Sequence, residues 1–256
     1  MPLTPCFIAP ARLETIRERY RLFPLLPISY ATVRDYSDGA AQLPEIGTIA
    51  RDLKDAQRPW MLKAIIGNTP PGGRLLEIGA GDPHVAHWLD LLGYEVTIVD
   101  PYDGSGHGPT DFEFYRRHFP RIKFIREHFS DHHAELKDAT FDSIYSISVL
   151  EHIPHAALLK VMAGIRRYQK PAAKTIHAVD HVHKGNGSEY HRTTLKVIAE
   201  GLTLKDSDVS SALANAHNDP DTYLLSAESH NMWRGDLSYD EFPMRRCLSM
   251  QFAQTL

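Results

Sequence analysis

A carboxylate and two glycines directly follow an apolar run in residues 75–86, which read LLEIGAGDPHVA. Glycines at such a place let the backbone approach a nucleotide closely, because a Cβ would collide with it. Gly79 and Gly81 occupy the first two positions of the dinucleotide fingerprint G-x-G-x-x-G, but His84 stands where the third glycine should be. The missing glycine argues against a pyrophosphate on the following helix. Glu77, two residues before Gly79, favours a cationic ligand instead.

A second carboxylate, Asp100, follows the next apolar run at residues 94–99. A carboxylate about 20 residues after such glycines commonly accepts hydrogen bonds from ribose hydroxyls. The sequence therefore predicts a nucleoside site in which the glycines and Asp100 meet at one edge of a sheet.

The elements that must position these residues alternate along the chain from residue 74 onward. Short apolar runs separated by helical periodicity predict a parallel α/β sheet with helices on both faces, and ligands then bind outside the carboxyl ends of the strands. We predict seven strands, mostly parallel, with an antiparallel C-terminal edge, because a loop without helical pattern separates the last two. The predicted strands are residues 74–79, 94–100, 121–129, 141–149, 173–182, 222–229 and 247–254.

The first 69 residues carry a different, proline-interrupted pattern. Apolar side chains recur at helical spacing in residues 46–66, and Pro59 is predicted to begin a helix there. We predict a helical or irregular lid over residues 1–69 and a ligand-binding domain over residues 70–256. The polar and aromatic side chains that would face a ligand, or alternatively cap the sheet, are Arg34, Tyr36, Gln57, Arg58 and Trp60.

The pattern E-x-G-x-G followed by Asp100 closely resembles the class I S-adenosylmethionine-dependent methyltransferases. Residues 141–155, FDSIYSISVLEHIPH, resemble the fourth strand and following helix of that family. The resemblance covers about residues 70–256. It implies a Rossmann-like methyltransferase domain over that range, S-adenosylmethionine as the cofactor, and methyl transfer as the activity.

The resemblance also implies roles for single residues in binding the cofactor. Glu77 helps to hold its amino end, Asp100 takes the ribose hydroxyls, and the backbone around Ser146 receives the amino group. The family usually has an acidic residue near the adenine amine after the third strand. Here His128 is expected at that place with Glu127 beside it, a departure from the pattern. The methionine part is lined by Gly79, Ala80 and Gly81, and Pro101 and Tyr102 pack near the adenine.

The methyl acceptor is expected beside residues 178–191, AVDHVHKGNGSEYH, which follow the fifth predicted strand. Where the acceptor is a hydroxyl, a base that removes its proton helps the reaction, and a neutral imidazole suits this near neutral pH. We predict His181 or His183 as the base, with Asp180 as an orienting partner. The alternative is that these histidines are loop residues bonded to backbone.

Asp180 with the neighbouring histidines also suits a divalent metal. Metal-dependent small-molecule methyltransferases, however, place acidic ligands after the fourth and fifth strands together. Residues 146–148 supply none, so we expect no metal.

Composition narrows the partners and the compartment. The net charge is −4, and the two cysteines, Cys6 and Cys247, stand far apart. The negative charge argues against a nucleic-acid partner. The cysteine spacing argues against a zinc ribbon and against a disulfide framework. We see no signal peptide and no apolar stretch long enough to span a membrane. We therefore expect a cytoplasmic protein with no membrane partner.

The sequence thus predicts a methyltransferase that acts on a hydroxyl of a small metabolite or sugar, a small-molecule or glycan acceptor. One alternative is a non-catalytic S-adenosylmethionine-binding protein. Another is a transferase of the same fold, such as an aminopropyl transferase, although the paired acidic residues that it would need are missing from residues 146–149. His84 and Glu77 count against an NAD-dependent oxidoreductase.

Overall fold

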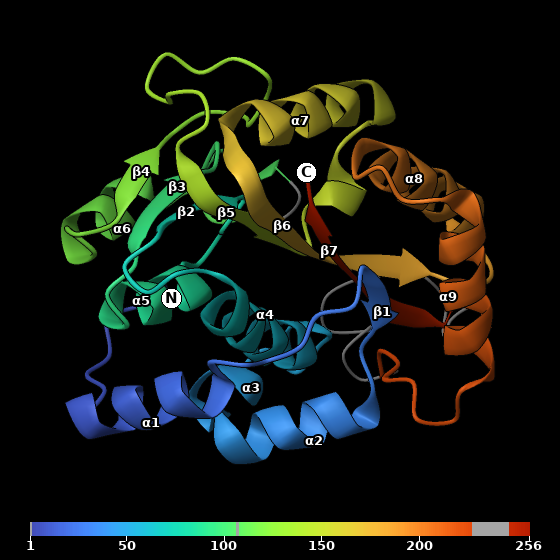
Figure 1. Cartoon of the computed structure of the whole chain (residues 1–256), viewed down its shortest axis with the longest axis horizontal. Helices are drawn as coiled ribbons and strands as arrows, with labels where there is room; N and C mark the ends of the chain where they lie inside the picture. Colours follow the sequence, from blue (N-terminus) through green and yellow to red (C-terminus); the bar gives the residue numbers. More distant parts are fainter. Residues whose placement is uncertain (1, 106–107, 227–245) are drawn as a thin grey trace.

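A seven-stranded mixed sheet forms the centre of the chain in this computed structural model, which describes residues 2–105, 108–226 and 246–256 (Figure 1). The strands are β1 (Ile28–Tyr30), β2 (Arg74–Ile78), β3 (Glu95–Val99), β4 (Lys123–Ile125), β5 (Phe141–Ile147), β6 (Gln169–Val182) and β7 (Cys247–Thr255). Their order across the sheet is β1-β7-β6-β5-β2-β3-β4.

The strands β6, β5, β2, β3 and β4 are neighbours and run parallel. This parallel part of the sheet begins with β2. The chain places β3 and β4 on one side of β2, and then β5 and β6 on the other side. The crevice at such a reversal is where open parallel sheets bind ligands, outside the carboxyl ends of the strands. The predicted α/β class and the mostly parallel Rossmann-like sheet are confirmed.

The antiparallel part of the sheet is the C-terminal strand β7, but β7 lies inside the sheet. The N-terminal strand β1 pairs with it, with Ile28 opposite Phe252, and covers an edge that would otherwise expose unpaired backbone groups. The prediction that residues 222–229 form a strand, the sixth of the predicted seven, was wrong for the part described. Leu224 forms an isolated bridge to Leu248, and the last three residues of that segment lie outside the described residues.

Helices cover both faces of the sheet, as the alternation of the sequence predicted (Figure 1). They are α1 (Pro10–Tyr20), α2 (Val33–Gln42), α3 (Pro44–Gly47), α4 (Lys54–Asn68), α5 (His84–Leu91), α6 (Phe112–His118), the 3-10 turn η2 (Leu150–His152), α7 (His155–Tyr168), α8 (Ser188–Gly201) and α9 (Asp206–Asn218). Apolar side chains of α1, α4, α5 and α6 join the core on one face, and those of α7, α8 and α9 join the core on the other.

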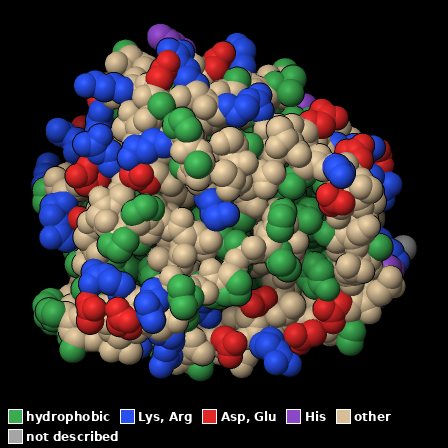
Figure 2. All heavy atoms as spheres, in the orientation of Figure 1, with side chains coloured by type: hydrophobic (Ala, Val, Ile, Leu, Met, Phe, Trp, Pro, Cys, Tyr) green, Lys and Arg blue, Asp and Glu red, His purple; other side chains and the backbone are tan. Residues whose placement is uncertain are grey.

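The surface carries both signs of charge. Figure 2 shows Lys and Arg side chains interspersed with Asp and Glu over the face in view, as a net charge of −4 suggests. Mixed charges of this kind produce little single-sign field. None of the described helices is long and apolar enough to cross a bilayer. The cytoplasmic location stays a prediction.

Successive residues of β6 point to opposite faces of the sheet. Ile176 and Ala178 belong to the core beneath α4 and α5, whereas Val179 belongs to the core beneath α7 and α8. By the same alternation, Asp180 points to the α4 face and His181 to the α8 face. Two residues that are adjacent in sequence therefore serve different sides of the molecule.

Helix α4 differs from its predicted extent. The sequence pattern placed a helix start at Pro59, but α4 begins at Lys54 and Pro59 lies inside it. Pro59 removes only the hydrogen bond to the carbonyl of Asp55, in the first turn of the helix. Because α4 is buried along most of its length, its packing against the sheet outweighs this local loss.

A buried carboxylate fixes the chain just before α4. Asp55 accepts hydrogen bonds from the N–H groups of Ile49 and Ala50 at 3.0 and 2.8 Å and from that of Arg51 at 2.7 Å. Its side chain is buried, so water does not replace these bonds when they are lost. The turn held by Asp55 directs α4 onto the sheet.

We expect Asp55→Ala to lower the free energy of unfolding by about 3 kcal/mol, because three backbone N–H donors lose the charged acceptor that they share. Urea unfolding of both proteins measures the difference. The exposed Asp131→Ala serves as the matched control, with a change within about 0.5 kcal/mol. Equal stability of Asp55→Ala and the wild type would show that the turn contributes nothing to the fold.

Candidate functional site

One carboxylate ties the turn after β2 to the end of β3. Asp100, which directly follows β3, accepts hydrogen bonds from the N–H groups of Gly81 at 2.9 Å and Tyr102 at 2.7 Å. The N–H of Gly79 donates to the carbonyl of Val99, the last residue of β3. The glycine turn and Asp100, paired in the sequence analysis, thus lie together at the carboxyl ends of adjacent parallel strands.

The two glycines of this turn are required by the backbone itself. Gly79 has a φ of +67°, and a Cβ on it would lie 2.7 Å from Cγ1 of Val149. Gly81 has a φ of +55°. Side chains are disfavoured at both φ values, so the turn brings bare backbone against the segment that follows β5, with Ala80 between the glycines.

Glu77 is a buried carboxyl group at the end of β2, before this turn. The hydroxyl of Tyr145 donates a hydrogen bond to it at 2.9 Å. Burial raises the pKa of Glu77 to about 8; the Tyr145 hydrogen bond opposes the shift, the charge of Asp100 adds to it, and the charge of Arg58 opposes it. A cationic group placed beside Glu77 would favour its ionised form. This is the ligand chemistry that the sequence predicted for the position.

A cavity of about 20 Å³ adjoins Glu77 and Ala80, which is room for about one water. Burial lowers the pKa of His84 in its wall to about 4, and the charge of Arg58 adds to this. A nucleoside with an amino-acid tail fits here only if side chains of the wall move aside. The chemistry of the wall suits such a ligand, because Lys54 and Arg58 match a carboxylate and Glu77 matches an amine. Further wall side chains are those of Lys54, Arg58 and Asp82.

Tyr102 lies beneath the turn rather than beside it. Its ring is buried against two rings of α6 and one of β4, and its hydroxyl donates to the carbonyl of Gly81 at 3.2 Å. A ring enclosed in this way presents no free face, so the contacts of Tyr102 give no support to its predicted packing on an adenine. Pro101 is half-buried, and its carbonyl accepts a hydrogen bond from Arg126 at 3.3 Å.

Glu127 and His128 follow β4, the neighbour of β3, and so lie at the same edge as Asp100. The carboxylate of Glu127 is 2.7 Å from Nδ1 of His133. His128 is exposed, with its Nε2 3.5 Å from a carboxylate oxygen of Asp103. Their predicted place at an adenine amine stays a prediction.

Ser146 lies in β5, level with Ile78 of β2. Its hydroxyl is hydrogen-bonded to Nδ1 of the buried His177 at 2.8 Å. The side chain is therefore part of the sheet's interior. The predicted role of Ser146 uses its backbone and stays a prediction.

Asp180 is the centre of a second group of polar side chains on the α4 face. Its carboxylate accepts hydrogen bonds from Nε2 of Gln57 at 2.7 Å and from the hydroxyl of Ser148 at 3.0 Å. Its backbone N–H donates to Oε1 of Glu151 at 3.0 Å. We call Gln57, Ser148, Glu151 and Asp180 the acidic cluster; it lies where β5 and β6 end.

Glu151, like Ser148, is a member of the acidic cluster that sequence reasoning missed. Its buried Oε2 has no hydrogen-bond partner among the described residues. Burial, and then the charge of Asp180, raise the pKa of Glu151. The signal was its place directly after the fourth predicted strand, where ligand-facing residues are expected.

His181 and His183 belong to the other face of the sheet. The ring of His181 lies 6.2 Å from those of His183 and His191. Burial, with His191 and His183 adding, lowers the pKa of His181 to about 3. The structure does not bring the carboxylate of Asp180 to the His181 ring, so the expected orienting pair does not form, because adjacent strand residues face opposite ways.

Metal ligands are not gathered at this edge. Within residues 2–105, 108–226 and 246–256, no group of three or more His, Cys, Asp or Glu side chains is placed to hold an ion. The expectation of a reaction without metal stays a prediction.

Comparison with known proteins places this geometry in a family. A family model described as a methyltransferase domain matches residues 51–206. That range contains Glu77, the glycine turn, Asp100 and the whole acidic cluster. No curated protein matches this chain.

Several solved structures are similar at low sequence identity. Phosphoethanolamine N-methyltransferase 2 of Haemonchus contortus is 17% identical with a TM-score of 0.48, over 88% of this chain and 60% of that one. The 1,6-didemethyltoxoflavin-N1-methyltransferase of Burkholderia thailandensis is 16% identical with a TM-score of 0.46, over 100% and 94%. This chain thus spans 60% of the length of the Haemonchus protein.

The family match covers more than half of the chain and includes both groups of site residues. It confirms the expected Rossmann-like methyltransferase domain. This chain belongs to the methyltransferase domain family.

Proposed function

We propose that this chain transfers the methyl group of S-adenosylmethionine to a hydroxyl of a small metabolite or a sugar. The observation that carries the proposal is the arrangement of Glu77, the glycine turn and Asp100 at adjacent strand ends. In that arrangement a cationic amine, a bare backbone contact and a ribose diol each find a partner of matching chemistry. When bound, the cofactor supplies a methyl group on a positively charged sulfur.

The residues that would hold the donor can do so without losing the hydrogen bonds that they make within the fold. Each oxygen of Asp100 accepts one backbone N–H, and a carboxylate offers about four lone-pair sites. Capacity therefore remains for two ribose hydroxyls without releasing the turn from β3. Glu77 would accept from the donor's amine, and Arg58 or Lys54 would pair with its carboxylate.

The acidic cluster supports removal of the acceptor proton by Asp180. Asp180 and Glu77 both point to the α4 face, whereas the rings of His181 and His183 belong to the other. In this proposal Asp180 would take the hydroxyl proton as the new oxygen–carbon bond replaces the carbon–sulfur bond of the donor, which would leave as S-adenosylhomocysteine. Gln57 and Ser148 hold the carboxylate of Asp180 in place.

The N-terminal residues support a small acceptor. Side chains of α4 reach both the cavity beside Glu77 and the acidic cluster, so α4 is the part of residues 1–69 that we propose as the lid. Strand β1, by contrast, belongs to the sheet. A helix packed this closely over the strand ends favours a small molecule or a sugar over a polymer.

Asp100→Ala should weaken binding of S-adenosylhomocysteine by on the order of 1–3 kcal/mol, because hydrogen bonds to a charged acceptor are lost. Isothermal titration calorimetry measures the dissociation constant. Asp103→Ala, three residues further along and more exposed, is the matched control and should bind as the wild type does. An unchanged constant for Asp100→Ala would mean that the ribose lies elsewhere.

Glu77→Gln should change how stability depends on pH. The pKa of Glu77 is about 8 in the fold against 4.5 for the ordinary group, so its contribution is present below pH 4.5 and is lost as pH rises through 8. The variant cannot ionise at this position. Its free energy of unfolding relative to the wild type should therefore rise between about pH 5 and about pH 8.5. The exposed Glu200→Gln should show no such trend in urea titrations, and a flat difference for Glu77→Gln would refute the assignment.

Asp180→Asn should lower turnover by about 100-fold or more if its carboxylate takes the acceptor proton, while affinity for S-adenosylhomocysteine stays within about twofold. Turnover is measured as release of S-adenosylhomocysteine across a panel of hydroxyl-bearing metabolites and sugars. His181→Ala and His183→Ala are the comparison variants and should keep most of their turnover. The reverse pattern, with the histidine variants inactive and Asp180→Asn active, would show that His181 or His183 is the base instead.

A further inference from the structure

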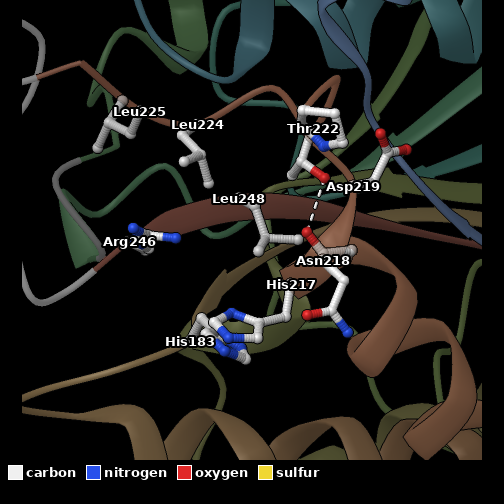
Figure 3. Close-up of a pocket in the computed structure, with 11 residues that line it drawn as sticks. His183, His217, Asn218, Asp219, Thr222, Leu224, Leu225, Arg246 and Leu248 are labelled. Atoms are coloured by element: carbon white, nitrogen blue, oxygen red, sulfur yellow. Dashed lines mark hydrogen bonds between the residues drawn. The ribbon is translucent and has the colours of Figure 1, made fainter.

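A second, larger cavity lies where β6 ends and β7 begins, beside the end of α9 (Figure 3). Its volume is about 390 Å³, which is within the range of small-molecule binding sites. It shares no lining residue with the cavity beside Glu77. Nothing in methyl transfer as proposed above uses it.

Three nitrogen-bearing side chains gather at one end of this cavity. The rings of His183 and His217 are stacked, with centroids 4.4 Å apart, and Figure 3 shows Arg246 on the same side of the cavity as these rings. The Nδ1 atom of His217 is buried with no hydrogen-bond partner among the described residues. Burial, and then His217, lower the pKa of His183. An anion at this end would offset that effect and satisfy the unpaired nitrogen.

The rest of the wall is mainly apolar, with Leu224 and Leu248 among its side chains. One carboxylate, that of Asp219, also lines the cavity, but Figure 3 shows it at the end away from Arg246. Its oxygens accept hydrogen bonds from the Tyr30 hydroxyl and from the N–H of Asp221, both at 2.8 Å. The cavity therefore has a cationic end, an apolar body and a far end whose acid is already engaged.

We infer that this cavity binds a small organic carboxylate with an apolar body, at a site separate from the methyl-donor site. The guanidinium of Arg246 matches the two oxygens of a carboxylate with paired N–H donors, and an imidazole N–H of His217 adds a third. The body of the ligand packs against Leu224 and Leu248. This inference does not rest on the proposed methyl acceptor.

The test uses 1-naphthoate as the probe on the full chain, with isothermal titration calorimetry. We expect saturable binding at a single site. The neutral 1-naphthalenemethanol, of nearly the same shape, should bind about tenfold more weakly, because it lacks the charge that Arg246 recognises. Failure of 1-naphthoate to saturate at millimolar concentration, or equal affinity for the neutral analogue, would overturn the inference.

Variants locate the binding within the cavity. Arg246→Gln should weaken 1-naphthoate about tenfold, and Leu224→Trp, at a partly exposed position, should abolish binding by filling the space. Arg117→Gln on α6, an arginine remote from the cavity, is the matched control and should bind normally. Wild-type affinity in Arg246→Gln or Leu224→Trp would place the probe elsewhere and reject the site.

The donor proposal is tested separately in the same samples. S-adenosylhomocysteine should bind Arg246→Gln and Leu224→Trp as it binds the wild type, which also shows that both variants are folded. Loss of 1-naphthoate binding with retained S-adenosylhomocysteine binding supports the cavity site. A chain that binds 1-naphthoate but not S-adenosylhomocysteine would reject the donor site and leave this one standing.

Discussion

The hydrogen bond from the Gly81 N–H to the Asp100 carboxylate is the contact on which the proposed donor site depends. The parallel register sets Ile78 level with Val99, so the residues after β2 and β3 emerge side by side. Asp100 then joins them, with one oxygen on Gly81 and the other on Tyr102. A left-handed turn at glycine would otherwise leave buried N–H groups without partners, which is costly. The site is therefore held in shape by the fold itself, before any ligand adds its contacts.

Acidic groups are concentrated at this edge of the sheet, and burial acts on three of them. It raises the pKa of Glu77, Asp100 and Glu151 above their ordinary values. Each of these carboxyls also accepts a hydrogen bond from the protein, which limits the penalty of removing them from water. A ligand with a cationic amine lowers that penalty further, whereas an anionic dinucleotide would increase it. The charge of the site thus favours the same cofactor class that we propose from the glycine spacing.

Local patterns in the sequence predicted that the glycine turn and Asp100 lie together, and non-local packing explains most of what those patterns missed. Glu77, the glycines and Asp100 are each marked by a strand end, which periodicity reveals. Strand β1 has three residues, too few for a periodic signal, and depends on pairing with a strand more than 200 residues away. Tyr102 turns inward because its backbone φ is +47° and three rings surround it. The burial of Glu151 likewise depends on neighbours that spacing does not reveal.

The opposite placement of Asp180 and His181, by contrast, was implicit once residues 173–182 were recognised as a strand. For the His181 ring to reach the α4 face, β6 would have to slip by one residue against both of its neighbours. Such a slip turns every side chain of the strand over. Ile176 and Ala178 would leave the core beneath α4, and the antiparallel pairing of His181 with Leu248 would break. Because that core is buried, the register excludes the slip. The pairing of β6, rather than proximity in sequence, is therefore what favours the carboxylate over the imidazole as the proposed base.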